Sequence, residues 1–340
     1  MDKQQIDALV KSERYEMVET HISWLLMDKD NVYKIKKPVN FSFLDFSTLE
    51  KRKFFCEEEV RLNRRLSPDV YLGVVAITRD GASGRSVGDG KTKRNTGGEV
   101  VSGGLVFGGD GEVVDYAVKM KRLDQKTMMD KNLREGKVSE AEIRKLASIV
   151  ADFHKKAETV KGDYGSPATV LRQIADLGAF RDAIEEACGY GRKVDFILER
   201  SKKFIDANEA LFRKRMADGK VKDCHGDLHS GNIFLQDMRI FDCIEFNRDF
   251  RCIDVASDIS FMAMDLDFFG KEDFSRLFVE EYVKRSGDKE ALSLLGIYKC
   301  YRANVRAKVA AIEWTQNKNK GSEERIRRYT ELAEKYAKLL

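Results

Sequence analysis

The sequence predicts an α+β protein in which a small strand-rich part precedes a larger, mainly helical part. Residues 20–39 hold two β-branched and aromatic runs on either side of the turn-forming sequence DKDN, a pattern typical of a β-hairpin. From about Met128 the apolar residues recur at three- and four-residue spacings, which are typical of amphipathic helices. This change of pattern places a domain boundary near residue 123, so we expect domains over 1–123 and 124–340.

The expected elements of the first part follow in order along the chain. Strands are predicted over 20–27 and 31–39, a helix over 47–66 with Ser47 as its cap, and further strands over 70–78 and 113–123. Residues 80–111, between the last two strands, are polar and rich in glycine. The first part is therefore a small set of strands with one helix.

The second part is helical except for one short hairpin. Helices are predicted over 139–160, over most of 168–218 with a break near Gly189, and from Ile253 to the end with a break near Gly287. Residues 233–246 read as two short strands around a turn at 236–238.

Composition and charge exclude several classes of protein. Hydrophobic residues make up 42% of the chain and charged residues 35%, enough for a core and a well-solvated exterior. A net charge of +4 is too small to indicate a nucleic-acid or membrane partner, and no apolar run is long enough for a transmembrane helix. The six cysteines are scattered without a Cys-x-x-Cys pair and the amino terminus is polar, so we expect a cytoplasmic protein.

Two motifs beside the predicted hairpin carry groups that can do chemistry. HGDLHSGN (225–232) places Asp227 five residues before Asn232, and FDCIEF (241–246) adds Asp242. Phosphoryl transfer needs a carboxylate that orients the attacking hydroxyl, together with oxygen ligands that hold Mg²⁺ against the phosphates. The spacing equals that of the kinase catalytic loop H-R-D-x-x-x-x-N, with His225 at the histidine position.

With these motifs the sequence resembles the aminoglycoside phosphotransferase-like kinases, a family with the protein-kinase-like fold. Four further stretches are similar to a bacterial branch of that family whose substrate is unassigned: ETHISW (19–24), VYKIKKP (32–38), FLDFSTLE (43–50) and the run from Cys56 to Leu66. The resemblance covers almost the whole chain. It implies two lobes, with 1–123 binding the nucleotide and 124–340 carrying the catalytic loop and the acceptor site.

The resemblance also implies roles for individual residues in the second lobe and in FDCIEF. Asp227 would be the catalytic base, with His225 beside it in the catalytic motif. Asn232 and Asp242 would bind the metal. Asp258 matches an aspartate that the family places in a structural helix.

In the first lobe the resemblance implies the nucleotide-binding groups. Lys34 would contact the phosphates and Glu59 would pair with it, while the backbone around Lys121, Arg122 and Leu123 would meet adenine. Lys36 lies on the same strand face as Lys34 and stays an alternative. Lys119 follows a glycine-rich run that imitates a kinase phosphate loop, but ADFH (151–154) resembles the first helix after the hinge in these kinases, which implies that 113–120 is the strand that enters the hinge.

Several residues near the motifs keep two interpretations. His229 either shapes the loop or transfers a proton, and Glu245 either binds a second metal or caps a strand. Arg302 and Arg306, one helical turn apart, either form a salt-bridged surface or line the acceptor site. The aspartates of 253–267 either form an acidic acceptor pocket or belong to an ordinary solvated helix.

Two motifs in the glycine-rich segment are interpreted as loop. GDGKT (88–92) looks like part of a P-loop, but Arg85 stands where that motif needs glycine. The basic run KTKRN (91–95) is read as a solvated loop rather than a nucleic-acid contact.

The function expected from the sequence is transfer of the γ-phosphate of ATP, with Mg²⁺, to a hydroxyl of a small molecule. We expect no nucleic-acid partner and no membrane, while the acceptor and the oligomeric state stay open. The alternative is a nucleotide-binding regulatory module with little or no catalysis, which the glycine-free stretch ETHIS (19–23) favours.

Overall fold

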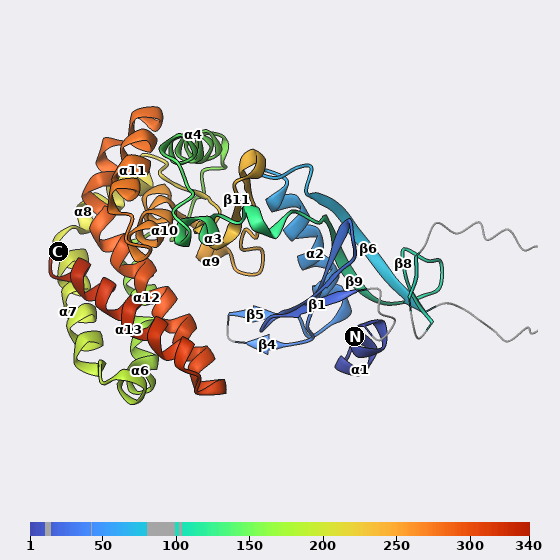
Figure 1. Cartoon of the computed structure of the whole chain (residues 1–340). Helices are drawn as coiled ribbons and strands as arrows, with labels where there is room; N and C mark the ends of the chain where they lie inside the picture. Colours follow the sequence, from blue (N-terminus) through green and yellow to red (C-terminus); the bar gives the residue numbers. More distant parts are fainter. Residues whose placement is uncertain (11–14, 42, 80–98, 102–103) are drawn as a thin grey trace, which may run out of the picture. The chain divides into compact units, whose positions relative to one another are not determined.

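The computed structural model describes the chain except residues 11–14, 42, 80–98 and 102–103 (Figure 1). The motifs at 88–92 and 91–95 lie outside the described residues. Contacts group the chain into two compact units, one of Met1–Asp124 with Phe241–Asn247 and one of Gln125–Ile240 with Arg248–Leu340. The segment that carries Asp242 therefore packs with the first unit, although the division at 123/124 assigned it to the second domain.

The first unit is built on an antiparallel sheet of seven strands in the order β1-β2-β3-β9-β6-β8-β7. The strands are β1 (Glu16–Glu19), β2 (Ser23–Met27), β3 (Asn31–Lys36), β6 (Tyr71–Arg79), β7 (Glu99–Val101), β8 (Leu105–Phe107) and β9 (Glu112–Lys121). β2 and β3 form the hairpin expected over 20–39, with Trp24 opposite Ile35. A separate hairpin joins β4 (Asn40–Phe41) and β5 (Leu44–Asp45).

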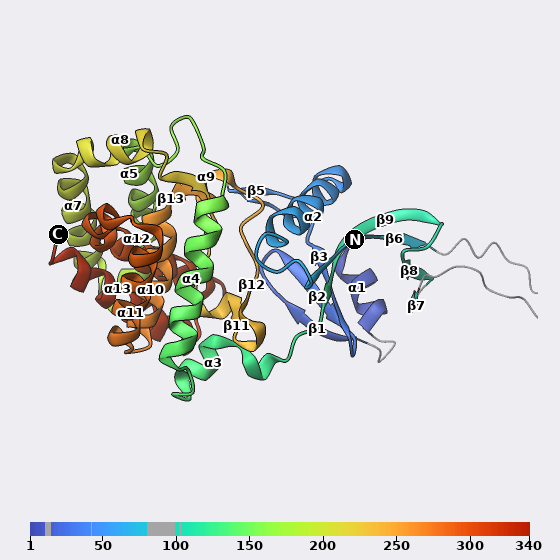
Figure 2. The same cartoon turned by 90° about the horizontal axis from the view of Figure 1, so that it is seen from above.

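A helix packs against each face of this sheet (Figures 1 and 2). Tyr33 and Ala117 share a core with Ile6 of α1 (Lys3–Val10), whereas Val118 shares another core with Cys56 of α2 (Leu49–Asn63). Successive strand residues point to opposite faces, so Lys34 and Lys36, which alternate with Tyr33 and Ile35, face α2.

Two expectations for the helices of this unit were wrong. The sequence predicted one helix, but the structure adds α1, whose eight residues are too short to show a clear helical pattern and depend on the packing of Ile6. The cap of α2 is Thr48 rather than Ser47, because the Thr48 hydroxyl accepts a hydrogen bond from the Lys51 N–H (3.3 Å).

The second unit is mainly helical. Its helices are α3 (Met129–Arg134), α4 (Glu140–Lys156), α5 (Pro167–Ala175), α6 (Arg181–Cys188), α7 (Gly191–Ala207), α8 (Glu209–Ala217), α9 (Arg248–Arg251), α10 (Val255–Phe268), α11 (Glu272–Ser286), α12 (Leu292–Asn317) and α13 (Lys320–Ala337). The strand pairs are β10 (Val221–Asp223) with β13 (Cys252–Asp254), and β11 (Ile233–Phe234) with β12 (Arg239–Ile240). The expected breaks are confirmed, since α6 and α11 each end at a left-handed glycine, Gly189 and Gly287.

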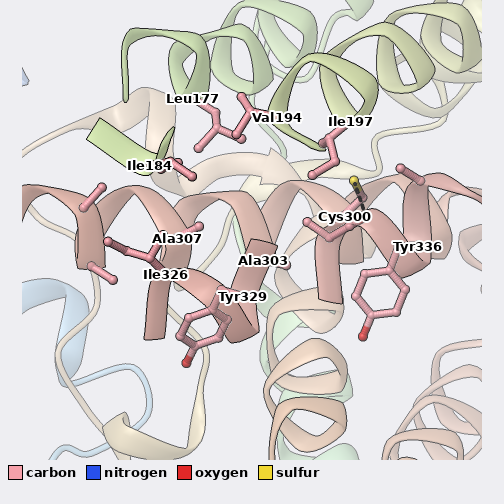
Figure 3. Packing of buried hydrophobic residues seen from close by; sticks show 14 of the residues in the cluster. Leu177, Ile184, Val194, Ile197, Cys300, Ala303, Ala307, Ile326, Tyr329 and Tyr336 are labelled. Atoms are coloured by element: carbon pink, nitrogen blue, oxygen red, sulfur yellow. Dashed lines mark hydrogen bonds between the residues drawn. The ribbon is translucent and has the colours of Figure 1, made fainter. Parts of the chain in front are cut away.

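The core of this unit lies where α12 and α13 pack on α6 and α7 (Figure 3). Ala303 and Ala307 present small side chains on α12, which let the neighbouring helices approach closely, and Ile326 of α13 fills the space beside them. The expected helix over 139–160 is α4, which begins with a capping box between Ser139 and Glu142. Among the described residues no helix is long and apolar enough to cross a membrane.

A buried ion-pair cluster fixes the start of α10. The fully buried Arg215 guanidinium donates to both carboxylate oxygens of Asp254 (2.7 Å each) and to Asp288 (3.0 Å). Asp254 also caps α10, because its side chain accepts a hydrogen bond from the Ala256 N–H (2.8 Å).

We expect Arg215→Leu to lower the free energy of unfolding by about 3–5 kcal/mol, because it leaves the buried Asp254 carboxylate without a counter-charge and Asp288 with only Lys220, 3.6 Å away. Arg213→Leu on the same helix is the matched control, since the ion pair of Arg213 with Glu209 is exposed and its loss should cost less than about 1 kcal/mol. Urea denaturation at pH 7 measures both values. Equal losses in the two variants would contradict a stabilising role for the buried cluster.

Candidate active site

The loop 224–232 connects β10 to β11, and the Asp258 carboxylate of α10 binds its backbone. The buried Asp258 accepts hydrogen bonds from the backbone N–H of His225 (3.1 Å) and of Gly226 (2.8 Å). It also contacts Nε2 of the buried His154 (3.0 Å), whose Nδ1 bonds to the Tyr282 hydroxyl (2.8 Å). The backbone immediately before Asp227 is thereby fixed in position.

Both glycines of the motif are required by the local geometry. Gly226 has φ +85°, and a Cβ there would lie 2.7 Å from the Phe250 carbonyl oxygen. A Cβ on Gly231 would lie 2.9 Å from Cε1 of His229. Real Cβ atoms do not approach other atoms so closely, so a side chain at 226 would displace backbone and one at 231 would displace the His229 ring.

The Asp227 side chain is oriented by its own loop. Its Oδ2 accepts a hydrogen bond from Nδ2 of Asn232 (2.8 Å) and lies 3.3 Å from Nε2 of His229. His229 Nδ1 accepts the Gly231 N–H (3.1 Å), so the proton of a neutral imidazole lies on Nε2 and faces Asp227. The His225 Nδ1 accepts the Asp227 N–H (3.3 Å), which places the buried His225 under the backbone of Asp227.

The ionisation of Asp227 follows from its neighbours. Burial by itself would raise its pKa, but His229 and the Arg306 guanidinium lower the pKa well below its usual range. About a third of the Asp227 side chain is exposed (31%), so an ionised carboxylate is open to a ligand at neutral pH. His229 thus contacts and orients Asp227 in addition to shaping the loop.

The aspartates of α10 form neither an acidic pocket nor a solvated face. Asp254 pairs with Arg215 and Asp258 holds the loop. Asp265 accepts a hydrogen bond from the Ser230 N–H (2.8 Å), and Asp267 pairs with Lys299 (2.9 Å). Both sequence interpretations of 253–267 were wrong, because helical spacing does not reveal that these carboxylates point into the protein.

The first unit carries a cluster in which two lysines lie among three carboxylates. Lys34 Nζ lies 2.9 Å from Glu59 Oε1 and 2.6 Å from Asp242 Oδ1. Lys36 Nζ lies 2.7 Å from Glu59 Oε2 and also pairs with Glu245. Lys36 is fully buried, whereas the Lys34 and Asp242 side chains are 12% and 42% exposed, so Lys34 is the lysine that a ligand can reach.

Glu245 has neither of its two expected roles, a ligand of a second metal or a strand cap. It is buried against Lys36, so it is neither free for a second metal nor at a strand end. Burial raises the pKa of Glu245, and Lys36 only partly offsets this increase. Burial would also raise the pKa of Glu59, but Lys34 and Lys36 lower it and keep Glu59 ionised.

The segment 241–247 is irregular, although two strands were predicted over 233–246. β12 ends at Ile240, and Asp242 takes a left-handed conformation with φ 63° that no strand accommodates. The Asp242 N–H donates to the Tyr71 hydroxyl (3.1 Å) and the Cys243 N–H to Asn63 Oδ1 (2.8 Å). No local pattern points to Tyr71 and Asn63, since their partners lie far along the chain.

The expected adenine contact lies at the end of β9. The Lys121 N–H donates to the Val70 carbonyl and the Arg122 N–H to the Asp30 carbonyl (2.8 Å each). Leu123 is partly buried against the core that faces α2. Lys119 lies opposite Tyr33 in the sheet and above its ring, hence on the face away from Glu59, which agrees with its rejection as the phosphate lysine.

We expect Gly226→Ala to lower the free energy of unfolding by more than about 2 kcal/mol, because it adds a backbone clash to the usual 1–2 kcal/mol cost of a left-handed alanine. Gly136→Ala is the matched control, since Gly136 has φ +66° but its Cβ would meet nothing within 4 Å. Urea denaturation of both variants tests this difference. A cost for Gly226→Ala no greater than for Gly136→Ala would contradict the tight packing of the loop.

The Asp258 carboxylate should make stability depend on pH in a defined window. Burial alone would raise the pKa of Asp258, but the hydrogen bond with His154 and the field of Arg302 lower it to about 2. Because this folded pKa is below the unfolded one, the carboxylate stabilises the fold above about pH 4 and loses this effect as the pH falls towards 2.

We therefore expect Asp258→Asn to cost about 2–3 kcal/mol at pH 7 and progressively less below about pH 4. Urea denaturation of the wild type and the variant at pH 7, 4 and 3 measures the difference. A difference that stays constant over this range would show that the stabilisation does not come from the carboxylate charge.

Comparison with known proteins assigns a family. A model described as the phosphotransferase enzyme family (APH) matches residues 99–295. The uncharacterized protein Rv2004c of Mycobacterium tuberculosis (strain ATCC 25618 / H37Rv) is 30% identical over 323 residues, which cover 91% of this chain and 57% of the relative. The uncharacterized protein Mb2027c of Mycobacterium bovis gives the same values. The chain thus spans little more than half the length of the curated relatives it matches.

Solved structures agree with the expected fold. A choline kinase from Cryptosporidium parvum Iowa II matches 99% of this chain and 94% of its own, with a TM-score of 0.51 and 10% identity. An ethanolamine kinase from Plasmodium vivax matches 98% and 84%, with a TM-score of 0.50 and 10% identity. The prediction of a protein-kinase-like α+β fold, with a β-rich amino-terminal lobe and a mainly helical carboxy-terminal lobe, is confirmed. Because the family model covers more than half of its residues, this chain belongs to the phosphotransferase enzyme family.

Proposed function

We propose that this protein transfers the γ-phosphate of ATP, with Mg²⁺, to a hydroxyl group of a small molecule. The observation that carries the proposal is the ionised Asp227 carboxylate, which is about a third exposed (31%) and lies on a loop whose backbone is hydrogen-bonded to the buried Asp258. A pre-positioned carboxylate is what transfer to a hydroxyl requires, because most of the rate gain comes from placing the reactants. The Lys34–Glu59 pair supports the proposal as a phosphate-binding element.

In the proposed reaction Asp227 accepts a hydrogen bond from the acceptor hydroxyl and takes its proton during transfer. The hydroxyl oxygen forms a bond to the γ-phosphorus while the bond between that phosphorus and the bridging oxygen of ADP breaks. Asn232 and His229 hold the carboxylate oxygen from the loop side. His225 acts by positioning the backbone of Asp227 rather than by touching the acceptor.

Asn232 in the second unit and Asp242 in the first unit are the proposed magnesium ligands, and each offers an oxygen atom. Asn232 directs its amide nitrogen at Asp227, which leaves its amide oxygen for a ligand, and Asp242 offers a carboxylate that is 42% exposed. Magnesium prefers oxygen ligands and few protein contacts, with water completing the shell. When bound, the ion neutralises charge on the phosphates.

The nucleotide would be held by the first unit. Lys34 would contact the phosphates and Glu59 would orient it, as their ion pair already does. The backbone N–H groups of Lys121 and Arg122 are used within the sheet, so the carbonyls of this stretch and the Leu123 N–H are the groups proposed for adenine. The glycine-free stretch ETHIS forms the tight turn between β1 and β2, where the Thr20 N–H donates to the Ser23 carbonyl (2.9 Å).

We expect Asp227→Asn to reduce the transfer rate by at least about 100-fold, because the amide cannot accept the hydroxyl proton. The variant should still gain thermal stability from ATP with Mg²⁺. Asp242→Ala should instead lose the magnesium-dependent part of that gain. A thermal-shift titration with ATP, with and without Mg²⁺, combined with a transfer assay, separates the two effects.

Asp273→Asn is the control, because Asp273 is an exposed aspartate on α11. Full turnover in Asp227→Asn would refute the assigned role of Asp227. Absence of any stabilisation by a nucleotide in the wild type would refute ATP binding and with it the proposed function. Stabilisation without turnover would favour the regulatory module expected as the alternative.

A further inference from the structure

Two arginines one turn apart on α12 lie beside the catalytic loop. The expectation that Arg302 and Arg306 form a salt-bridged surface was wrong, because Arg302 is buried and Arg306 is partly buried. Within the part of the chain that the structure describes, neither guanidinium has a carboxylate within 4.0 Å. Both cations are therefore withdrawn from water without a direct counter-charge, which is costly unless a ligand supplies one.

Arg302 joins α12 to the backbone next to Asp227. Its Nη1 donates to the Gly226 carbonyl (3.0 Å) and its Nε to the Ser257 carbonyl (3.2 Å). The guanidinium lies 4.8 Å from the centre of the Phe261 ring. Its Nη2 is buried and finds no hydrogen-bond acceptor among the described residues. Arg302 thus ties the helix to the loop and adds positive charge behind it.

Arg306 lies about 6 Å further along the axis of α12, on the same side as Arg302. Its single hydrogen bond to the described residues is a long one, from Nε to the Tyr329 hydroxyl (3.4 Å). Its two Nη groups are left with free donors, unlike those of Arg215, which are bound by two carboxylates. Arg306 is close enough to Asp227 and Asp265 to interact electrostatically with both.

Those two carboxylates are already bound elsewhere. Asp265 accepts hydrogen bonds from Ser230, and Asp227 is bound by Asn232 and His229. The planar fork of an arginine fits a carboxylate or a phosphate, which it can bind through two parallel hydrogen bonds. The free Nη donors of Arg306, which interacts electrostatically with Asp227, therefore suit an anion that arrives with the substrate.

We propose that Arg306 binds a carboxylate or phosphate group of the acceptor, so that the substrate is an anionic small molecule whose hydroxyl reaches Asp227. This inference rests on the proposed function and names the substrate class of the same site. Arg302 supports the site by fixing α12 against the loop and by adding positive charge. The paired aspartates of α10 agree with it, because they leave no acidic surface there for a polycationic acceptor.

The test sorts candidate acceptors by charge. A small-molecule cell extract is passed over an anion-exchange resin, and the retained and unretained fractions are each incubated with the protein, Mg²⁺ and ATP labelled at the γ-phosphate. We expect label to enter compounds of the retained fraction. Arg306→Gln should raise the half-saturating concentration of such an acceptor by about 10- to 100-fold, the loss expected for a charge-assisted hydrogen bond.

Two further variants control for charge and folding. Arg306→Lys keeps the charge without the fork and should show a smaller increase. Arg328→Gln on α13 is the matched control, because Arg328 is exposed and donates to the Phe268 carbonyl (2.8 Å). Stabilisation by ATP with Mg²⁺ in each variant shows that the fold and the nucleotide site are intact.

Several results would overturn the assignment. Label that enters only the unretained fraction would show a neutral or cationic acceptor. An unchanged half-saturating concentration in Arg306→Gln would remove Arg306 from the acceptor site, and a loss of kcat alone would assign it to the transferred phosphoryl group. Absence of label in both fractions, with nucleotide binding intact, would instead overturn the proposed transfer reaction on which the inference rests.

Discussion

The second unit depends on the hydrogen bonds between the Asp258 carboxylate and the backbone N–H groups of His225 and Gly226. They are buried, so each is stronger than in water and each would be costly to leave unmade. The same helix is fixed at its start by Asp254 and binds Ser230 through Asp265. One helix thus positions the loop at both ends of the motif. As a consequence α10 carries several buried carboxylates, and each of them needs a hydrogen-bond or charge partner.

The first unit also contains buried charges, and there one carboxylate is shared between two lysines. Glu59 bridges Lys34 and Lys36, so a single buried carboxylate satisfies two ammonium groups. Lys36 and Glu245 are both buried, and they attach the segment 241–247 to β3. Lys34 and Asp242 lie at the accessible end of the cluster and neutralise each other. The two pairs therefore differ in role because they differ in burial. The buried Lys36–Glu245 pair holds the segment, while the accessible Lys34–Asp242 pair can exchange its partners for a ligand.

Local patterns in the sequence predicted the elements well and long-range pairing poorly. The hairpin at 20–39 and the helix expected over 139–160 depend on neighbouring residues, and both are present as expected. Asp227 and Asn232 lie five residues apart in one motif, and in the structure their side chains form a hydrogen bond. In contrast, Glu245 pairs with a lysine 209 residues away, which no local pattern encodes. The aspartates of α10 were misread for the same reason, since their partners come from other elements.

The charges near Asp227 bear on the kind of substrate the proposed reaction takes. A carboxylate that acts as a base attracts cations, so a site for a cationic acceptor gains from further acidic groups. Here the neighbouring acids are paired internally, and the groups left with free donors are guanidinium nitrogens. Arg306, together with His229, lowers the pKa of Asp227 against the effect of burial. The positive charge of Arg306 would also repel a cationic group of an acceptor bound near it. Membership of the phosphotransferase family does not by itself determine the acceptor, whereas these side chains support the proposed anionic acceptor.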